Sequence, residues 1–207
     1  MRCASRSRSR RIANSAPQGI RAILLCACLA GAATAAGEPE TYRVEPQLSS
    51  SQFVVTHFGF MRQHGRFGRT EGTIVIDTEQ HSGQIELLID ASTIDTGWEL
   101  RDAWLRGEDM FDVGRFPVMR FRSTRLTFEQ DRLIGVTGLL TLHGATHPVT
   151  FRIDRLQCAP DADTGRRGCD ATATSTIRRS DFGLTYALGW VGDDVDLSLR
   201  VAAIRAP

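Results

Sequence analysis

Residues 72–90 read GTIVIDTEQHSGQIELLID, and this stretch decides the fold class. Its two apolar runs, Gly72–Asp77 and Gln84–Asp90, are rich in β-branched residues and follow a period of two rather than a helical period. Between them lies a polar segment that contains Gly83, which is typical of a hairpin turn. The stretch therefore predicts two antiparallel strands.

The strand pattern continues outward on both sides of this hairpin. Eight or more antiparallel strands in one domain favour a β-sandwich or an up-and-down barrel, and an eight-stranded barrel either holds one small ligand or is filled by side chains. One segment differs, because Leu100 and Trp104 lie four apart between Gly97 and Gly107, which predicts a helix of about two or three turns. Further strands are predicted at 53–58, 118–124, 125–129, 133–142, 149–156, 170–177 and 194–201.

The first 36 residues have the composition of a secretory signal peptide. Residues 1–36 hold six arginines and no acidic residue, and an apolar run from Ala22 to Ala33 leads to small residues. The run is shorter than the roughly 20 residues that span a bilayer, so cleavage is expected rather than anchoring. We expect export to the periplasm, by the general secretory route or, given the pair Arg10-Arg11, by the twin-arginine route. Residues 37–207 then form the mature domain.

The composition of this domain excludes several classes of function. Loss of residues 1–36 leaves 19 arginines against 24 acidic residues, a net charge of −5. Nucleic acid is therefore not an expected partner, because phosphate binding needs a basic surface. The chain has no lysine, which excludes Schiff-base chemistry. Cys158 and Cys169 bracket a turn-rich loop, and in an oxidising compartment this pair predicts a structural disulfide, since redox pairs usually have closer spacing.

No motif in the sequence predicts catalysis or metal binding. His143 and His147 have the spacing of zinc-binding helices, but Gly144 and Pro148 argue against a helix, so a turn between strands is expected there. The chain lacks the nucleophile elbow, the phosphate-binding loop and the dinucleotide fingerprint. We therefore expect no catalytic residue, no metal and no cofactor.

Several short signatures occur in a fixed order along the chain. They are Tyr42-Arg43-Val44, Phe53-Val54-Val55-Thr56-His57, Gly65-Arg66-Phe67, Ala91-Ser92-Thr93-Ile94-Asp95-Thr96-Gly97, Asp109-Met110-Phe111-Asp112, residues 138–146 and Arg179-Ser180-Asp181-Phe182-Gly183. Through them, residues 42–201 resemble the YceI-like family of polyisoprenoid-binding, lipocalin-like periplasmic proteins. Trp104 departs from this family, which usually has histidine there.

The resemblance implies an all-β fold: an extended antiparallel eight-stranded lipocalin-like barrel with a short helix near one end. Such a barrel encloses an apolar tunnel for an isoprenoid, a quinone or another long-chain lipid. Strand parity then predicts the lining, because the more apolar face of each strand should point inward. Trp104 and Phe111 join the set because exposed aromatic residues on a helix should cover something apolar. The predicted ligand-binding residues are Phe53, Val55, His57, Ile74, Ile76, Leu87, Ile89, Trp104, Phe111, Met119, Phe121, Val136, Leu140, Phe151, Leu197 and Leu199.

Hypotheses of different classes remain open at this point. The first is a soluble carrier of an apolar lipid, in which His57 is either a polar anchor for the head group or a hydrogen-bonded core residue. The second is a small hydrolase that uses His57 with a nearby carboxylate, and the third is a filled barrel that acts through a surface contact. Arg101 and Asp102 are expected to form buried ion pairs that fix the helix onto the barrel, or to contact a head group. A transient membrane or membrane-protein contact is a further expectation.

Overall fold

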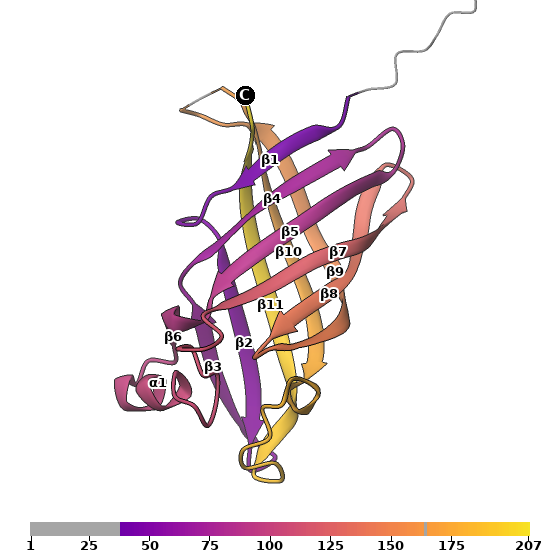
Figure 1. The fold of residues 1–207 in the computed structure, drawn as a ribbon. Coiled ribbons are helices and arrows are strands. Elements are labelled where there is room, and N and C mark those ends of the chain that lie inside the picture. The colour runs from indigo at the N-terminus through magenta and orange to yellow at the C-terminus, as the bar shows by residue number, and fades with distance from the viewer. Residues whose placement is uncertain (1–37, 164) are drawn as a thin grey trace, which may run out of the picture. The chain divides into compact units, whose positions relative to one another are not determined.

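A computed structural model describes residues 38–163 and 165–207, so the predicted signal peptide lies outside the described residues. The described strands form one antiparallel sheet in which eight strands close into a barrel (Figure 1). This confirms the expected barrel over the sandwich. In order around the barrel, the strands are β1 (Glu40–Val44), β4 (Thr70–Asp77), β5 (Ser82–Asp90), β7 (Val118–Glu129), β8 (Arg132–Leu142), β9 (Ala145–Pro160), β10 (Arg167–Arg178) and β11 (Val191–Arg205), which pairs back to β1.

Strand β11 is long enough to pair with two successive strands along one edge. The C-terminal end of β11 pairs with β1, and its N-terminal part pairs with β2 (Ser50–His57). Beyond β2 follow β3 (Met61–Phe67) and the short β6 (Ile94–Asp95). Helix α1 (Glu99–Leu105) lies close to β6 at this side of the barrel (Figure 1). Two 3-10 turns, η1 (Ala91–Thr93) and η2 (Arg179–Phe182), complete the described elements.

The inner face of the barrel carries the apolar core, as strand parity predicts. Leu87 of β5 lies opposite Phe121 of β7, and Phe121 lies opposite Leu140 of β8, so buried side chains from neighbouring strands meet. Leu139, one residue away, points outward and is 44% exposed. The hairpin of β4 and β5 is confirmed, with strands slightly longer than the apolar runs.

Several element boundaries differ from the predictions. Residues 118–124 and 125–129 form the single strand β7, whose pairing register with β8 shifts between Ser123 and Arg125. The helix predicted between Gly97 and Gly107 is confirmed. It spans Glu99–Leu105, so Trp98 lies outside it as the residue before its first turn. Strands β1, β3 and β6 were not predicted. Each is short or lacks a run of alternating apolar residues. Pairing places them in the sheet: β1 pairs with β4 and β11, β3 with β2, and β6 with β3.

The predicted disulfide joins Cys158 and Cys169, but both cysteines lie within strands rather than in the loop between them. They are directly opposite each other in β9 and β10, and the chain reverses direction beyond Pro160. The bond therefore links two adjacent strands of the barrel covalently. Among the described residues, no helix is long and apolar enough to cross a membrane.

Candidate functional site

Two cavities occupy the inside of the barrel. The first, of about 270 Å³, lies toward α1, and the second, of about 200 Å³, lies toward the disulfide. The first cavity reaches the surface at Trp104 and Tyr186, which line it and are 39% and 56% exposed. The presence of these cavities argues against a barrel filled by its own side chains.

Every residue of the predicted lining faces one of the two cavities. Ile74, Ile76 and Val136 line the second cavity, and the other thirteen line the first. That these side chains bind a ligand stays a prediction. The parity argument missed several residues of the first cavity that lie outside the strands or near strand ends, chiefly Leu105, Met110, Leu184, Tyr186 and Val191.

A ring of four buried side chains separates the two cavities. Leu87, Phe121, Phe151 and Leu199 line both cavities, so they form their common boundary. The rings of Phe121 and Phe151 meet edge to face with 5.2 Å between centroids. We call these four residues the constriction. Because it consists of side chains, rotamer changes could join the cavities into one tunnel.

The first cavity has a polar end that carries positive charge. Its charged or titratable lining residues are His57, Arg101, Arg179 and Tyr186, and none of its lining residues is an aspartate or glutamate. Burial lowers the pKa of His57 below its ordinary value, and the charges of Arg101 and Arg179 lower it further. At neutral pH the imidazole is therefore uncharged, with one ring nitrogen able to donate and the other able to accept.

The contacts of Arg101 and Asp102 correct the predicted ion pairs. Arg101 donates to the Thr96 hydroxyl at 2.7 Å, to the Thr96 carbonyl at 2.8 Å and to the Gln63 side chain at 2.7 Å. Asp102 is buried and accepts from the Thr96 amide and hydroxyl. Thr96 therefore bridges the two side chains and ties α1 to the sheet. Within the described residues Arg101 uses three of its five N–H groups in this way, which leaves two that can face a ligand.

Arg179 has a role that the sequence did not reveal. It is 5% exposed and donates to four backbone carbonyls, those of Leu184, Tyr186, Val191 and Gly192, at 2.5–2.9 Å. These bonds hold the segment between η2 and β11 at the mouth of the first cavity. The sequence feature that could have indicated this role is the signature Arg179-Ser180-Asp181-Phe182-Gly183. In it, Gly183 adopts a φ of +78°, which favours glycine.

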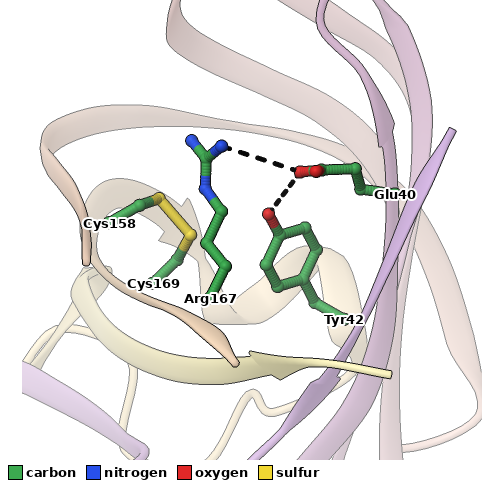
Figure 2. Close-up of a disulfide and its surroundings, with 5 residues drawn as sticks. All are labelled: Glu40, Tyr42, Cys158, Arg167 and Cys169. Atoms are coloured by element: carbon green, nitrogen blue, oxygen red, sulfur yellow. Dashed lines mark hydrogen bonds and ion pairs between the residues drawn. A yellow bond between two sulfur atoms is a disulfide. The ribbon is translucent and has the colours of Figure 1, made fainter. Parts of the chain in front are cut away.

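The second cavity ends in a different polar group, drawn in Figure 2. The Tyr42 hydroxyl donates to the Glu40 carboxylate at 2.5 Å, and Arg205 and Arg167 approach the same carboxylate at 3.1 and 4.0 Å. Burial raises the pKa of Tyr42 to about 12, and the bond to Glu40 adds to this shift. Arg167 lies beside the disulfide in the cavity wall (Figure 2). Glu40 and Asp131, which both line this cavity, balance the formal charges of Arg167 and Arg205, so this end does not select for an anion.

The site offers little to catalysis. A histidine that acts as a general base is normally oriented by a carboxylate, whereas the charges that act on His57 are both guanidinium groups. Among the described residues, no three His, Cys, Asp or Glu side chains gather closely enough to hold a metal ion. His143 and Gly144 form the turn between β8 and β9, as predicted, with positive φ at both residues.

Comparisons with known proteins give one consistent result. The model of the YceI-like domain matches residues 42–203. A UPF0312 protein of Pseudomonas paraeruginosa is 33% identical over 163 residues, covering 78% of this chain and 84% of the relative. Protein YceI of Salmonella arizonae is 31% identical over 162 residues, with the same coverage.

Solved structures resemble the barrel as well. BcnA of Burkholderia cenocepacia has a TM-score of 0.64 at 22% identity, covering 77% of this chain and 98% of that one. A domain from Saccharophagus degradans, described as a polyisoprenoid binding domain, has a TM-score of 0.59 at 19% identity, covering 80% and 98%. At this level of identity, the likeness concerns the fold.

Proposed function

Because the chain belongs to the YceI-like family, we propose that its barrel binds one long-chain isoprenoid or similar apolar lipid. The observation that carries this proposal is the pair of apolar cavities that meet at the constriction. Their volumes of 270 and 200 Å³, together about 470 Å³, fall within the range of about 300–1,000 Å³ for small-molecule sites. The polyisoprenoid-binding description of the Saccharophagus domain supports the same class of ligand.

Burial of hydrocarbon can supply the required affinity. Each buried methylene contributes roughly 0.8 kcal/mol, so a five-carbon isoprene unit contributes about 3–4 kcal/mol before costs. Ordering the flexible chain and losing its free motion consume part of this gain. About four units can still reach micromolar affinity, which needs about 8 kcal/mol. The lining therefore needs no charged group along the chain, in agreement with the residues found there.

The polar end of the first cavity suits a head group that accepts hydrogen bonds. Arg101 has donors to spare, and His57 is uncharged and can donate from one ring nitrogen. A quinone carbonyl, an alcohol or an amide oxygen fits this chemistry. We therefore place the head group between His57 and Arg101 and the chain along the barrel, toward the constriction.

We further propose that the protein works as a carrier in the periplasm. The predicted signal peptide supports export, and the disulfide between Cys158 and Cys169 suits an oxidising compartment. The barrel would then shield the lipid chain from water while the protein carries the lipid through the periplasm. Binding, rather than turnover, is its task.

A matched pair of substitutions tests the proposal. Leu140 lines the first cavity and is 6% exposed, whereas its neighbour Leu139 points outward. Leu140→Trp should fill space that the lipid needs, and Leu139→Trp should not. Delipidated mature protein would be titrated with geranylgeraniol, an isoprenoid alcohol of about four units, and the complex followed by native mass spectrometry. We expect binding to weaken at least about ten-fold in Leu140→Trp, which corresponds to about 1.4 kcal/mol.

The control separates a blocked cavity from a damaged fold. Thermal unfolding of both variants should show a folded barrel, since a larger side chain that enters a cavity costs less than one forced into a packed core. Equal binding by Leu140→Trp and Leu139→Trp would place the lipid elsewhere. A wild-type protein that carries no apolar mass and takes up no isoprenoid would refute the proposal itself.

A further inference from the structure

Two loops at one end of the barrel expose large apolar side chains. The β2–β3 turn and the segment before β11 lie side by side there (Figure 1), with the Phe58 amide donating to the Trp190 carbonyl at 2.6 Å. The rings of Phe58 and Trp190 also meet, with 5.9 Å between centroids. Six residues of these loops are more than 40% exposed, and we call them the aromatic rim: Phe58, Phe60, Met61, Tyr186, Leu188 and Trp190.

Such a concentration is unusual for a protein surface. Single exposed apolar residues need no explanation, but a contiguous exposed patch marks an interaction site. Phe60 and Trp190 are 77% and 68% exposed, although both are large enough to contribute substantially to a core. All three tryptophans of the chain are exposed, and Trp104 of α1 joins the patch because its ring lies 4.8 Å from that of Tyr186.

The aromatic rim is continuous with the mouth of the first cavity. Tyr186 belongs to the rim and also lines the cavity, and Trp104 lines the cavity beside it. Hydrogen bonds from the buried Arg179 to backbone carbonyls of this loop fix the conformation of its backbone. A partner seated on the rim would therefore face the cavity entrance directly.

The two loops that carry the rim are uncharged, because residues 58–61 contain no charged side chain. Residues 182–192 contain no charged residue, and the arginines farther along β3 and beyond it are ion-paired, Arg66 with Asp95 and Arg69 with Glu71. Arg62 directly follows Met61 and is well exposed, although it lies 3.6 Å from the equally exposed Asp196. A carboxylate in the rim loops would repel an anionic surface, and these loops contain none.

From this arrangement we propose that the aromatic rim docks the protein onto the surface of a phospholipid bilayer. Tryptophan and tyrosine favour the interface between lipid and water, where the ring meets hydrocarbon and the polar atom meets head groups. Exposed apolar side chains bind such interfaces by burying hydrocarbon at the boundary between head groups and acyl chains. The existence of the surface is independent of the ligand, but the choice of a bilayer over a protein rests partly on the proposed lipid-binding function, because such a ligand is taken from membranes.

Vesicle binding of two variants tests this proposal. Phe60 and Trp190 line neither cavity, so the double variant Phe60→Ser/Trp190→Ser should keep the barrel and its lipid. The control is Leu48→Ser, which removes another well-exposed apolar side chain, 62% exposed, outside the rim. Mature protein would be sedimented with vesicles of phosphatidylethanolamine and phosphatidylglycerol. We expect about a ten-fold or greater loss of partitioning for the double variant and less than about two-fold for the control.

Tryptophan emission adds a local readout. Wild-type emission should shift to shorter wavelength on vesicle binding, and Trp190→Phe should reduce the shift while it preserves partitioning, because the phenylalanine still inserts. Native mass spectrometry of co-purified lipid would be recorded for every variant. This measurement reports the proposed lipid-binding function independently of vesicle binding.

Three results would overturn the proposal. A wild-type protein that carries isoprenoid but ignores vesicles would remove the membrane docking and leave the lipid-binding function intact. Equal partitioning of the double variant and wild type would show that the rim is not the docking surface. Concentration-dependent dimers that the double variant abolishes, without vesicle binding by wild type, would make the rim a contact between copies of the chain.

Discussion

His57 shows how surroundings determine what a single residue can do. The sequence left open whether it anchors a head group or packs as a core histidine, and it also suggested a hydrolase. The structure places His57 in the lining of the first cavity, where burial first, and then the charges of Arg101 and Arg179, lower its pKa. Sequence pattern predicted its inward direction, because it shares a strand face with Phe53 and Val55. It could not predict its electrostatic neighbours, which come from η2 and α1.

The lowered pKa of His57 makes barrel stability depend on pH. The folded state binds the proton less well than the unfolded chain, whose histidine has a pKa of 6.5. Stability from this group is therefore fully present above pH 6.5 and is lost as the pH falls through the lower pKa of the folded state. We expect the melting temperature of the wild-type protein to decrease as the pH is lowered from 6.5. The melting temperature of His57→Gln should decrease less over the same pH range. Parallel curves for the two proteins would show that His57 does not contribute to this dependence.

Strands were predictable from the sequence where one of their faces is apolar. They were less predictable where pairing with a neighbouring strand determines their position and length. The hairpin of β4 and β5 follows from alternation alone. Residues 118–129 read as two strands because the inward residues change from odd numbers, such as Phe121, to even numbers, such as Leu126. The register shift between Ser123 and Arg125 explains this change within one strand, since one extra residue reverses the facing of all that follow.

The disulfide is the device that joins β9 to β10 covalently. Cys158 and Cys169 are 11 residues apart, so their bond closes a short loop in the unfolded chain. By the chain-entropy estimate, a loop of about this size contributes roughly 3 kcal/mol to stability. Urea unfolding of Cys158→Ala/Cys169→Ala should show a loss of about this size, with a barrel still held by the backbone pairing on both sides. Wild-type protein in reductant should unfold like the variant.

Two results would contradict this account of the disulfide. Free thiols in unfolded protein that has not been reduced would mean that the bond does not form. An unchanged free energy of unfolding in the double variant would mean that the bond does not constrain the chain. Loss of lipid binding without loss of stability would instead point to a role for the cysteines in the second cavity, whose wall they share with Arg167.

At the scale of the whole molecule, the sequence predicted an apolar interior but not its division. Parity assigned each strand an inner face, and all sixteen predicted residues lie on a cavity wall. The constriction depends on how side chains from four strands meet across the barrel, which no local pattern encodes. Gly138 gives one clue, since a Cβ there would lie 2.5 Å from the Phe121 ring, so glycine leaves that ring its place. The aromatic rim likewise became visible only when two distant loops were brought together.

If the constriction divides the interior, its removal should change which lipids bind. Phe121→Ala would join the two cavities and allow a longer chain to lie along the whole barrel. The cost in stability should be about 3–5 kcal/mol, as for other large buried rings. Phe128→Ala is the matched control, because Phe128 lies on the same strand and packs against the core but lines neither cavity. Competition between isoprenoid alcohols of about three and about eight units, read by native mass spectrometry, gives the preference for chain length. We expect Phe121→Ala to shift that preference about ten-fold toward the longer alcohol, and Phe128→Ala to leave it unchanged. An equal preference in both variants would mean that the Phe121 ring already moves aside for a lipid, and that the two cavities act as one tunnel in the wild-type protein.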